Sequence, residues 1–393
     1  MLGSIFAGAV HDFLAGMISL RNGGESLPET IGRYLGVNFK QFMRGFTVLL
    51  MVLGGAVFVA GPAGLLAKLT PESLDLSFWA TVVFVYYVLA TLLPIDKIIG
   101  KIYPIFAIAL IFMAAGILFM IFWHHPALPE LTDGIANTHP DGLPIFPMMF
   151  ISIACGAISG FHATQSPLMA RCMTNEKYGR PVFYGAMITE GIVALIWAAA
   201  ATYFFHTEEG SALFAAGSGN DNAAVIVDSI TKEWLGVVGG FLAILGVIAA
   251  PITSGDTAFR SARLIVADFL RVDQKPILKR LMISVPLFVA GYIILHANFS
   301  VLWRYFAWCN QTLAVFTLWA LTVYLTQKRK PYVITLIPAL FMTAVCSTYI
   351  LIAREGLHLP QELAYWLGGA VTLFIFVLFL VWRNKYLRRN PTI

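Results

Sequence analysis

The sequence predicts an all-α protein, a polytopic transmembrane helical bundle of about eleven spans that forms one domain over residues 1–393. The first reason is composition: 59% of the residues are hydrophobic and 12% are charged, about half the charged fraction of a soluble domain. The second is that runs of roughly 20 apolar residues, the length of a membrane-spanning helix, recur along the chain. The third is that Lys and Arg fall almost entirely in alternate connections between these runs.

The expected spans are the apolar runs themselves, which charged and polar connections separate. Five of them, the first, fifth, sixth, seventh and ninth, also carry polar or ionisable side chains at membrane depth. In chain order, we expect spans at about residues 3–20, 45–68, 77–94, 103–123, 147–165, 184–205, 235–256, 281–297, 303–326, 332–353 and 363–382.

Positive charge is distributed asymmetrically across the expected membrane. With the first loop in the cytoplasm, the cytoplasmic connections and the C-terminal tail hold 22 of the 26 Lys and Arg residues. We therefore expect a multi-pass protein of the cytoplasmic (inner) membrane with its C-terminus inside and, because the span count is odd, its N-terminus outside. The net charge of +5 then reflects the orientation of the protein in the lipid membrane, and it does not indicate a nucleic-acid partner. The sequence does not define an oligomeric state.

The first span contains two ionisable residues, His11 and Asp12. An ionised side chain near the bilayer centre costs about 2.5–3.5 kcal/mol on insertion scales, so each needs a reason to be there. Adjacent residues point about 100° apart on a helix, so at most one of the two faces a given cavity squarely. Either both are paired with neighbouring helices, or they belong to a proton or ion relay.

The fifth span is interrupted in the stretch from Cys155 to Cys172, where Gly, polar and Pro residues replace the apolar pattern. Such a break is expected only where it is buried in protein or lines a cavity. Pro167 disfavours helix at the preceding residue, and a discontinuous helix exposes ends that suit ionic groups. The alternatives are a GxxxG packing motif and a simple end of the span. The candidate substrate or ion residues are Gly156, Gly160, His162, Thr164, Gln165 and Ser166.

The sixth and ninth spans add further candidates. Glu190 lies roughly two turns from the cytoplasmic end of its span, where it either reaches the interface, pairs with a loop cation or takes part in proton coupling. Asn310 and Gln311 either hydrogen-bond between helices or contact the substrate.

The seventh span ends in the sequence PITSGDT. Pro251 is expected to loosen the helix there, and the nearby hydroxyls and carboxylate suit a small cation or a polar substrate. The alternative is an ion pair on the helix surface between Asp256 and Arg260, which are four residues apart. The candidates are Thr253, Ser254, Asp256 and Thr257.

The sequence contains no recognisable enzyme motif. The four Cys are scattered without CxxC spacing, and no HExxH, GxSxG, P-loop or GxGxxG context occurs. We therefore expect no enzymatic activity, metal or cofactor, and at most a coupling ion, H⁺ or Na⁺. An intramembrane enzyme would require His11, Asp12 and His162 to converge.

Four stretches together resemble the carbon starvation protein A (CstA) family of membrane transporters. They are GAVHDF from Gly8, CGAISGFHATQSPLMARC from Cys155, PITSGDTAFRSARL from Pro251 and LWRYFAWCNQTLA from Leu302. The family is associated with peptide uptake during carbon starvation, and some members are pyruvate–proton symporters. The resemblance implies a LeuT-type fold, in which two inverted five-helix repeats surround a site at the membrane midplane.

The sequence departs from the family at its beginning. Members normally carry a histidine-containing helix, interrupted by Gly and Pro, before GAVHDF, whereas seven residues precede Gly8 here. The resemblance therefore implies a LeuT-type fold that lacks its N-terminal helix region, and with it half of the expected site.

The principal hypothesis is a secondary transporter that imports small peptides during carbon starvation. Proton coupling would use His11, Asp12, His162 and Glu190. One alternative is a pyruvate–proton symporter. Another is a truncated, non-transporting membrane protein or sensor, which the missing helix region would explain.

Overall fold

The computed structural model describes residues 1–92, 96–126, 128, 137, 142–215 and 223–390, and every regular element in these ranges is a helix. The chain divides into two compact units. The first comprises Met1–Thr47, Ala136–Gly191 and Ala307–Ile393, and the second comprises Val48–Ile135 and Ile192–Phe306. The unit boundaries fall inside or near three long helices, α3 (Val37–Leu69), α8 (Ala186–Phe204) and α14 (Phe299–Gln327).

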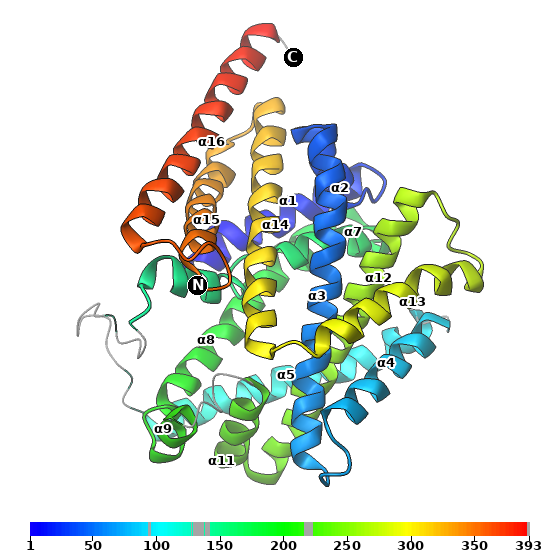
Figure 1. Cartoon of the computed structure of the whole chain (residues 1–393), viewed down its shortest axis with the longest axis vertical. Helices are drawn as coiled ribbons and strands as arrows, with labels where there is room; N and C mark the ends of the chain where they lie inside the picture. The colour runs from blue at the N-terminus through cyan, green and yellow to red at the C-terminus, as the bar shows by residue number, and fades with distance from the viewer. Residues whose placement is uncertain (93–95, 127, 129–136, 138–141, 216–222, 391–393) are drawn as a thin grey trace. The chain divides into compact units, whose positions relative to one another are not determined.

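Two packed helices of the first unit, α1 (Ala9–Arg21) and α7 (Gly160–Cys172), carry His11, Asp12 and His162. The π-helical turn η1 (Ser4–Gly8) leads into α1. A hairpin of two apolar helices, α15 (Val333–Ile352) and α16 (Gln361–Arg389), lies in the same unit and is coloured orange to red in Figure 1. The unit also contains α2 (Leu27–Leu35), η3 (Ile145–Met149), α6 (Phe150–Ala154), η4 (Glu176–Tyr178) and η5 (Arg180–Gly185).

The apolar core of the first unit joins α6, α14, α15 and α16. Ala314 and Leu318 are both fully buried, and their spacing of four residues places them on one face of α14. Ala339 and Val345 of α15 are also fully buried in this core. The buried face of α14 fixes the neighbouring residue Asn310 against the segment between α6 and α7.

The second unit consists of helices only, within the part of it that the structure describes. Its aromatic cluster joins three of them: Phe259 lies 5.1 Å from Phe288 and 5.9 Å from Phe84 between ring centroids. The hydroxyl of Tyr87 donates to the carbonyl of Ile252 at 3.0 Å. Its helices are α4 (Leu76–Leu92), α5 (Asp96–His124), α9 (Glu208–Ala215), α11 (Ala223–Ala243), η6 (Ile244–Ala249), α12 (Ala250–Leu270) and α13 (Ile277–Leu295).

Seven helices among the described residues are long and apolar enough to cross a membrane. They agree with seven of the eleven intervals expected from the sequence. The seven are Val37–Leu69, Pro104–His124, Glu176–Phe204, Ile277–Leu295, Phe299–Gln327, Val333–Ile352 and Gln361–Arg389.

The other four expected spans are shorter or interrupted, so the count of eleven is not confirmed. The interval 3–20 becomes η1 and the 13 residues of α1, and 77–94 becomes the 17 residues of α4. The interval 147–165 is split between α6 and α7. In 235–256, Gly236 has a non-helical conformation with φ 59°, which interrupts α11, and a π-helical segment follows.

The fifth expected span is interrupted within the predicted stretch from Cys155 to Cys172, but the break lies before Gly160 and not at Pro167. Residues 155–159 form a turn, and α7 then begins at Gly160 and continues through Pro167 to Cys172. Gly156 therefore lies in the turn and Gly160 in the helix, so the two do not form a GxxxG packing face on one helix. Two hydroxyls of this helix bond main-chain carbonyls in the turn before the proline. They are Thr164, bonded to Phe161 at 2.6 Å, and Ser166, bonded to His162 at 2.9 Å.

The helix at PITSGDT is not broken, contrary to the expectation. The segment η6 leads directly into α12, with Pro251 in the first turn of that helix. Gly255 packs closely on Tyr87, since a Cβ at this glycine would lie 2.2 Å from the tyrosine hydroxyl.

Candidate functional site

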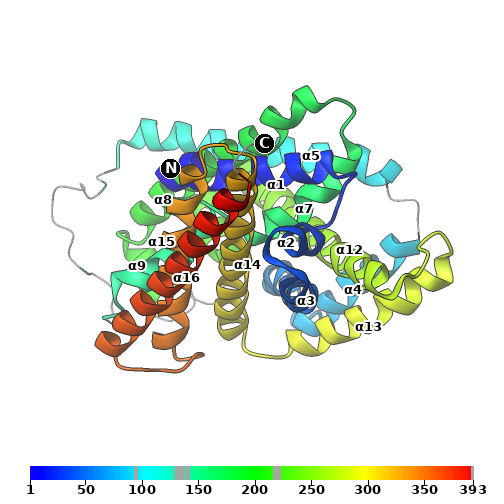
Figure 2. The same ribbon diagram turned by 90° about the horizontal axis from the view of Figure 1, so that it is seen from above.

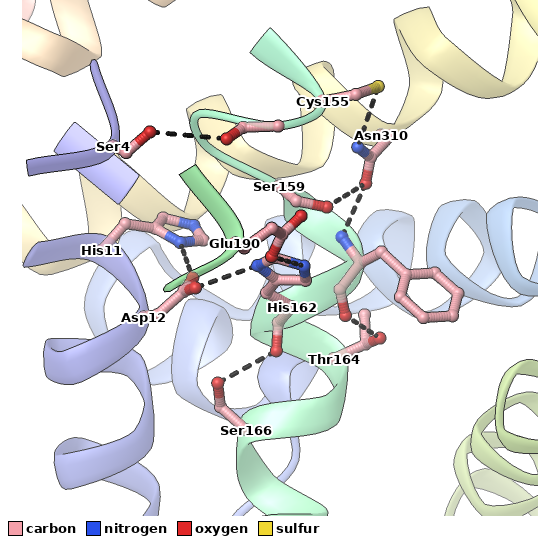
Figure 3. A network of polar contacts seen from close by, with 12 residues as sticks. Ser4, His11, Asp12, Cys155, Ser159, His162, Thr164, Ser166, Glu190 and Asn310 are labelled. Carbon is pink, nitrogen blue, oxygen red and sulfur yellow. Dashed lines mark hydrogen bonds and ion pairs between the residues drawn. The ribbon is translucent and has the colours of Figure 1, made fainter. Parts of the chain in front are cut away.

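Four ionisable side chains of the first unit form a continuous chain of contacts (Figure 3). Nδ1 of His11 lies 2.7 Å from Oδ1 of Asp12, and Nδ1 of His162 lies 2.9 Å from Oδ2 of the same carboxylate. Nε2 of His162 then lies 3.3 Å from Oε2 of Glu190. Asp12 is therefore bridged by two imidazoles, one from its own helix and one from α7, and Glu190 of α8 completes the chain.

The exposure of these side chains rises along the chain of contacts. The His11 side chain is 0% exposed and that of Asp12 is 7% exposed, whereas His162 reaches 28% and Glu190 reaches 42%. A charge inside a protein at membrane depth is costly unless it is paired and hydrogen-bonded. The buried Asp12 is paired on both oxygens, and the chain of contacts ends at the more exposed carboxylate of Glu190.

The contacts determine where protons lie. An ionised carboxylate only accepts hydrogen bonds, so we assign both histidines as donating Nδ1–H to Asp12. A neutral His162 then has only a lone pair at Nε2, and an ionised Glu190 has only lone pairs. Their contact of 3.3 Å therefore requires one proton, carried either by His162 as an imidazolium or by the Glu190 carboxyl. The two residues form a site at which one proton can be bound, exchanged and released.

His11 lies at the buried end of this chain of contacts. Its Nε2 is buried and has no hydrogen-bond partner among the described residues. Leaving a buried polar atom unpaired costs about 1–3 kcal/mol. Such an atom in a native structure is a candidate contact for a bound molecule or a transferred proton. His11 and Asp12 also contact each other directly, which neither alternative from the sequence specified.

Asn310 of α14 organises the break between α6 and α7 (Figure 3). Its Oδ1 accepts hydrogen bonds from the main-chain N–H of Phe161 at 2.6 Å and from the Ser159 hydroxyl at 3.2 Å. Its Nδ2 lies 3.8 Å from the Cys155 sulfur. The first turn of a helix has N–H groups without partners, and here the neighbouring helix supplies the cap. The interhelical alternative for Asn310 is therefore the one observed.

Gln311 hydrogen-bonds main-chain groups of the residues in the break that precede Ser159. With its amide oriented so that both of its groups are bonded, its nitrogen donates to the carbonyl of Ile158 at 2.9 Å and its oxygen accepts from the N–H of Cys155 at 3.0 Å. Gln311 is 0% exposed. The side-chain amides of two adjacent residues of α14 thus bond the main chain of an irregular segment. Lipid could not supply these hydrogen bonds.

Two glycines allow the backbone to approach closely around this segment. A Cβ at Gly160 would lie 2.3 Å from the carbonyl oxygen of Asn310, and a Cβ at Gly8 would lie 1.9 Å from that of Ala157. Both collisions are with backbone, which no side-chain rotation relieves. Gly160 thus permits the cap from α14, and Gly8 permits the contact of α1 with the turn.

Three other candidates of the fifth span, Thr164, Gln165 and Ser166, lie on α7, and Gly156 lies in the turn before it. Thr164 and Ser166 donate to carbonyls of their own helix, as described above. Nε2 of Gln165 lies 3.1 Å from the Thr164 hydroxyl. The carbonyl of Gly156 lies 3.4 Å from the Ser4 hydroxyl. Most of these hydrogen bonds are accepted by main-chain carbonyls around the site.

The seventh-span candidates form a separate group in the second unit. The hydroxyls of Thr253 and Ser254 donate to the carbonyl of Ala250 at 2.7 and 3.1 Å, and that of Thr257 donates to Thr253 at 2.8 Å. The carboxylate of Asp256 pairs with Arg260 at 3.0 Å, which confirms the ion pair considered as the alternative.

Sequence reasoning missed three participants in the site: the Ser159 hydroxyl, the main-chain N–H of Phe161 and the Cys155 sulfur. A signal for the first was present, because Ser before Gly is typical of the residue that precedes a helix. Its partner on α14 lies 151 residues away in the sequence, and no local pattern indicates it.

Comparisons with known proteins give the same picture. Residues 1–73, 67–233 and 198–349 match the family described as "Carbon starvation protein CstA". An "Uncharacterized membrane protein" of Haemophilus influenzae is 38% identical over 259 residues, covering 53% of this chain and 70% of that protein. The "Peptide transporter CstA" of Bacillus subtilis is 24% identical over 485 aligned positions, covering 96% of this chain and 80% of that one.

A shorter match and a solved structure add to these. The "Pyruvate/proton symporter BtsT" of Escherichia coli is 41% identical over 78 residues, covering 20% of this chain and 11% of that one. A crystal structure of a histidine-to-alanine mutant of the Eremococcus coleocola manganese transporter is similar in fold, with a TM-score of 0.56 and 13% identity, over 99% of this chain and 88% of that one. The family matches and the apolar helices together identify a multi-pass membrane protein. The resemblance carried by the four motifs is thereby confirmed, and the chain belongs to the carbon starvation protein CstA family.

Proposed function

We propose that this protein is a secondary transporter that imports small peptides across the cytoplasmic (inner) membrane during carbon starvation, in symport with protons. The observation that carries the proposal is the chain of contacts from His11 through Asp12 and His162 to Glu190, beside an interrupted helix. Transporters place substrate and coupling-ion sites at such interruptions. The name of the Bacillus subtilis relative supports peptides as the substrate.

Transport is proposed rather than catalysis. His11, Asp12 and His162 do converge, which an intramembrane enzyme would also need. However, the relatives with assigned names are transporters, and the solved structure with a similar fold is one too. We therefore assign the convergence to binding and releasing a proton.

The proton is the coupling ion that this chemistry favours over Na⁺. Hard cations take oxygen ligands, and both oxygens of Asp12 are already engaged by imidazoles. Histidine changes its charge in the physiological pH range more readily than other side chains. The contact between His162 and Glu190 holds one proton that either residue can carry.

The pair formed by His162 and Glu190 suits a zwitterionic substrate. A peptide offers an ammonium group at one end and a carboxylate at the other. The half-exposed Glu190 would pair with the ammonium, and the His162 imidazolium would pair with the carboxylate. The concentration of Lys and Arg on one side supports an orientation with the C-terminus in the cytoplasm and the N-terminus outside.

Pyruvate is the second candidate substrate, since a relative carries the name of a pyruvate–proton symporter. Pyruvate has a carboxylate for His162 but no ammonium for Glu190. The distinguishing variant is therefore Glu190→Gln. A peptide transporter should lose affinity for peptides through this change, whereas a pyruvate transporter should keep its affinity for pyruvate.

The test is uptake of a labelled dipeptide and of labelled pyruvate into proteoliposomes with an imposed inward proton gradient. We expect dipeptide accumulation that collapses when the gradient is dissipated. Asp12→Asn should abolish accumulation, and His206→Gln, which changes an exposed histidine of the second unit, should not. Accumulation of neither substrate by correctly inserted protein would reject the proposal and favour a non-transporting membrane protein or sensor.

A further inference from the structure

Three arginines lie close together where α12 and α13 pack in the second unit. They are Arg260 and Arg263 on α12 and Arg280 on α13. The charges of Arg260 and Arg280 both act on Arg263. Figures 1 and 2 show the two helices side by side, in yellow-green and yellow.

The surrounding structure holds this arrangement in place. Phe259, the residue before Arg260, packs on Phe288 of α13 at 5.1 Å between ring centroids. The guanidinium of Arg280 donates to the carbonyl of Gln274 at 2.6 Å and to that of Lys275 at 3.2 Å. Arg280 is thus anchored to the loop between the helices by main-chain acceptors, none of which carries a negative charge.

Two positive charges and one negative charge act on Arg263. Asp256 acts on Arg263, but it is bonded to Arg260 at 3.0 Å. Nε of Arg263 is buried and has no hydrogen-bond partner among the described residues. Burial, followed by the charges of Arg260 and Arg280, lowers the pKa of Arg263 to about 10, even though Asp256 acts to raise it. The Arg263 side chain is partly buried and its Nε lacks an acceptor, so an anion bound there would stabilise the protein.

We propose that Arg260, Arg263 and Arg280 form a binding site for a phosphate-bearing anion, with Arg263 supplying the donor that the protein leaves unpaired. Guanidinium groups match phosphate oxygens with paired hydrogen bonds. Basic pockets between membrane helices on the cytoplasmic side bind anionic lipid head groups. The charge distribution predicts that the connection between the seventh and eighth expected spans, in which all three arginines fall, is on that side. The site does not depend on which substrate is transported.

The experiment uses the full-length protein in neutral detergent, with the unfolding temperature and native mass spectrometry as readouts. The probes are phosphatidylglycerol, phosphatidylcholine and inorganic phosphate. The variants are Arg263→Gln and Arg280→Gln, and the matched control is Arg388→Gln, which alters an exposed arginine of α16. Because Arg263→Gln removes a partly buried charge whose Nε has no acceptor, we expect it to fold without added lipid.

We expect phosphatidylglycerol, but not phosphatidylcholine, to raise the unfolding temperature of the wild type and to remain bound in native mass spectra. Arg263→Gln and Arg280→Gln should each weaken this binding at least tenfold, while Arg388→Gln should leave it unchanged. If inorganic phosphate reproduces the Arg263-dependent shift and the lipid does not, the site takes free phosphate. No Arg263-dependent effect of either probe, or an equal effect in Arg263→Gln and the wild type, would overturn the proposal.

Discussion

The side chain of Asn310 accepts a hydrogen bond from the main-chain N–H of Phe161 at 2.6 Å. The helix that carries His162 is thus capped by a helix that lies 149 residues away in the sequence. Ser159 occupies the position that usually supplies a cap, but its side chain makes no such bond within its own helix. Its hydroxyl donates to Asn310 instead, at 3.2 Å. The start of α7, and with it the position of His162, therefore depends on α14.

Replacing Asn310 should weaken α7. In Asn310→Leu the N–H of Phe161 and the hydroxyl of Ser159 lose their acceptor inside the protein. We expect a loss of about 0.5–2 kcal/mol in stability, the range for a lost helix cap, and a larger loss of transport. The unfolding temperature in detergent and dipeptide uptake measure the two effects. Asn384→Leu on the exposed side of α16 is the control and should change neither.

Gly160→Ala should separate α7 from α14. The added Cβ would lie 2.3 Å from the carbonyl oxygen of Asn310, so the two helices would have to move apart. Overpacking of this kind costs about 1–3 kcal/mol. The control is Gly369→Ala on α16, where a Cβ would meet nothing within 4 Å. That change should be neutral or stabilising, because alanine favours a helix more than glycine does. Equal unfolding temperatures for the two variants would contradict the close approach.

Glu190→Gln should separate proton coupling from substrate passage. The variant keeps the size of the side chain but removes the carboxyl that shares a proton with His162. We expect exchange of substrate across the membrane to continue, with weaker affinity for a peptide, and accumulation driven by a proton gradient to fall at least tenfold. Measuring exchange and accumulation in the same proteoliposomes tests this. A variant that accumulates substrate like the wild type would show that Glu190 takes no part in coupling.

Glu29 should make the stability of the first unit sensitive to acid. Burial alone would raise the pKa of Glu29, but hydrogen bonds from Lys40 and Arg44 hold it below the ordinary value. A lowered pKa contributes stability that is complete above the ordinary glutamate range and is lost as the pH falls through the lowered value. The wild type should therefore lose more stability on acidification than Glu29→Gln. Unfolding temperatures recorded from neutral to acidic pH would reveal the difference, and parallel curves would contradict the ion pairs.

Part of this structure was predictable from the sequence, because the responsible patterns are local. Seven apolar runs became uninterrupted helices, and the ion pair between Asp256 and Arg260 follows from helical spacing. His11, Asp12, His162 and Glu190 were identified because ionisable residues at membrane depth need a reason.

The remainder depends on contacts between distant segments. The pairing of Asp12 with His162 joins residues 150 positions apart, and no local rule specifies it. The break was expected between Cys155 and Cys172, and it lies at residues 155–159, where Asn310 and Gln311 bond the main chain. The helix then continues through Pro167, although proline disfavours helix at the preceding residue.

The most direct test of the central claim is to measure proton movement that accompanies substrate uptake. Proteoliposomes in a weakly buffered medium are given a dipeptide without an imposed gradient, and the external pH is recorded. We expect the wild type to make the medium more alkaline as peptide enters. Asp12→Asn, which removes the carboxylate between the two histidines, should show no change. Peptide entry without proton movement in the wild type, or unchanged proton movement in Asp12→Asn, would contradict the account.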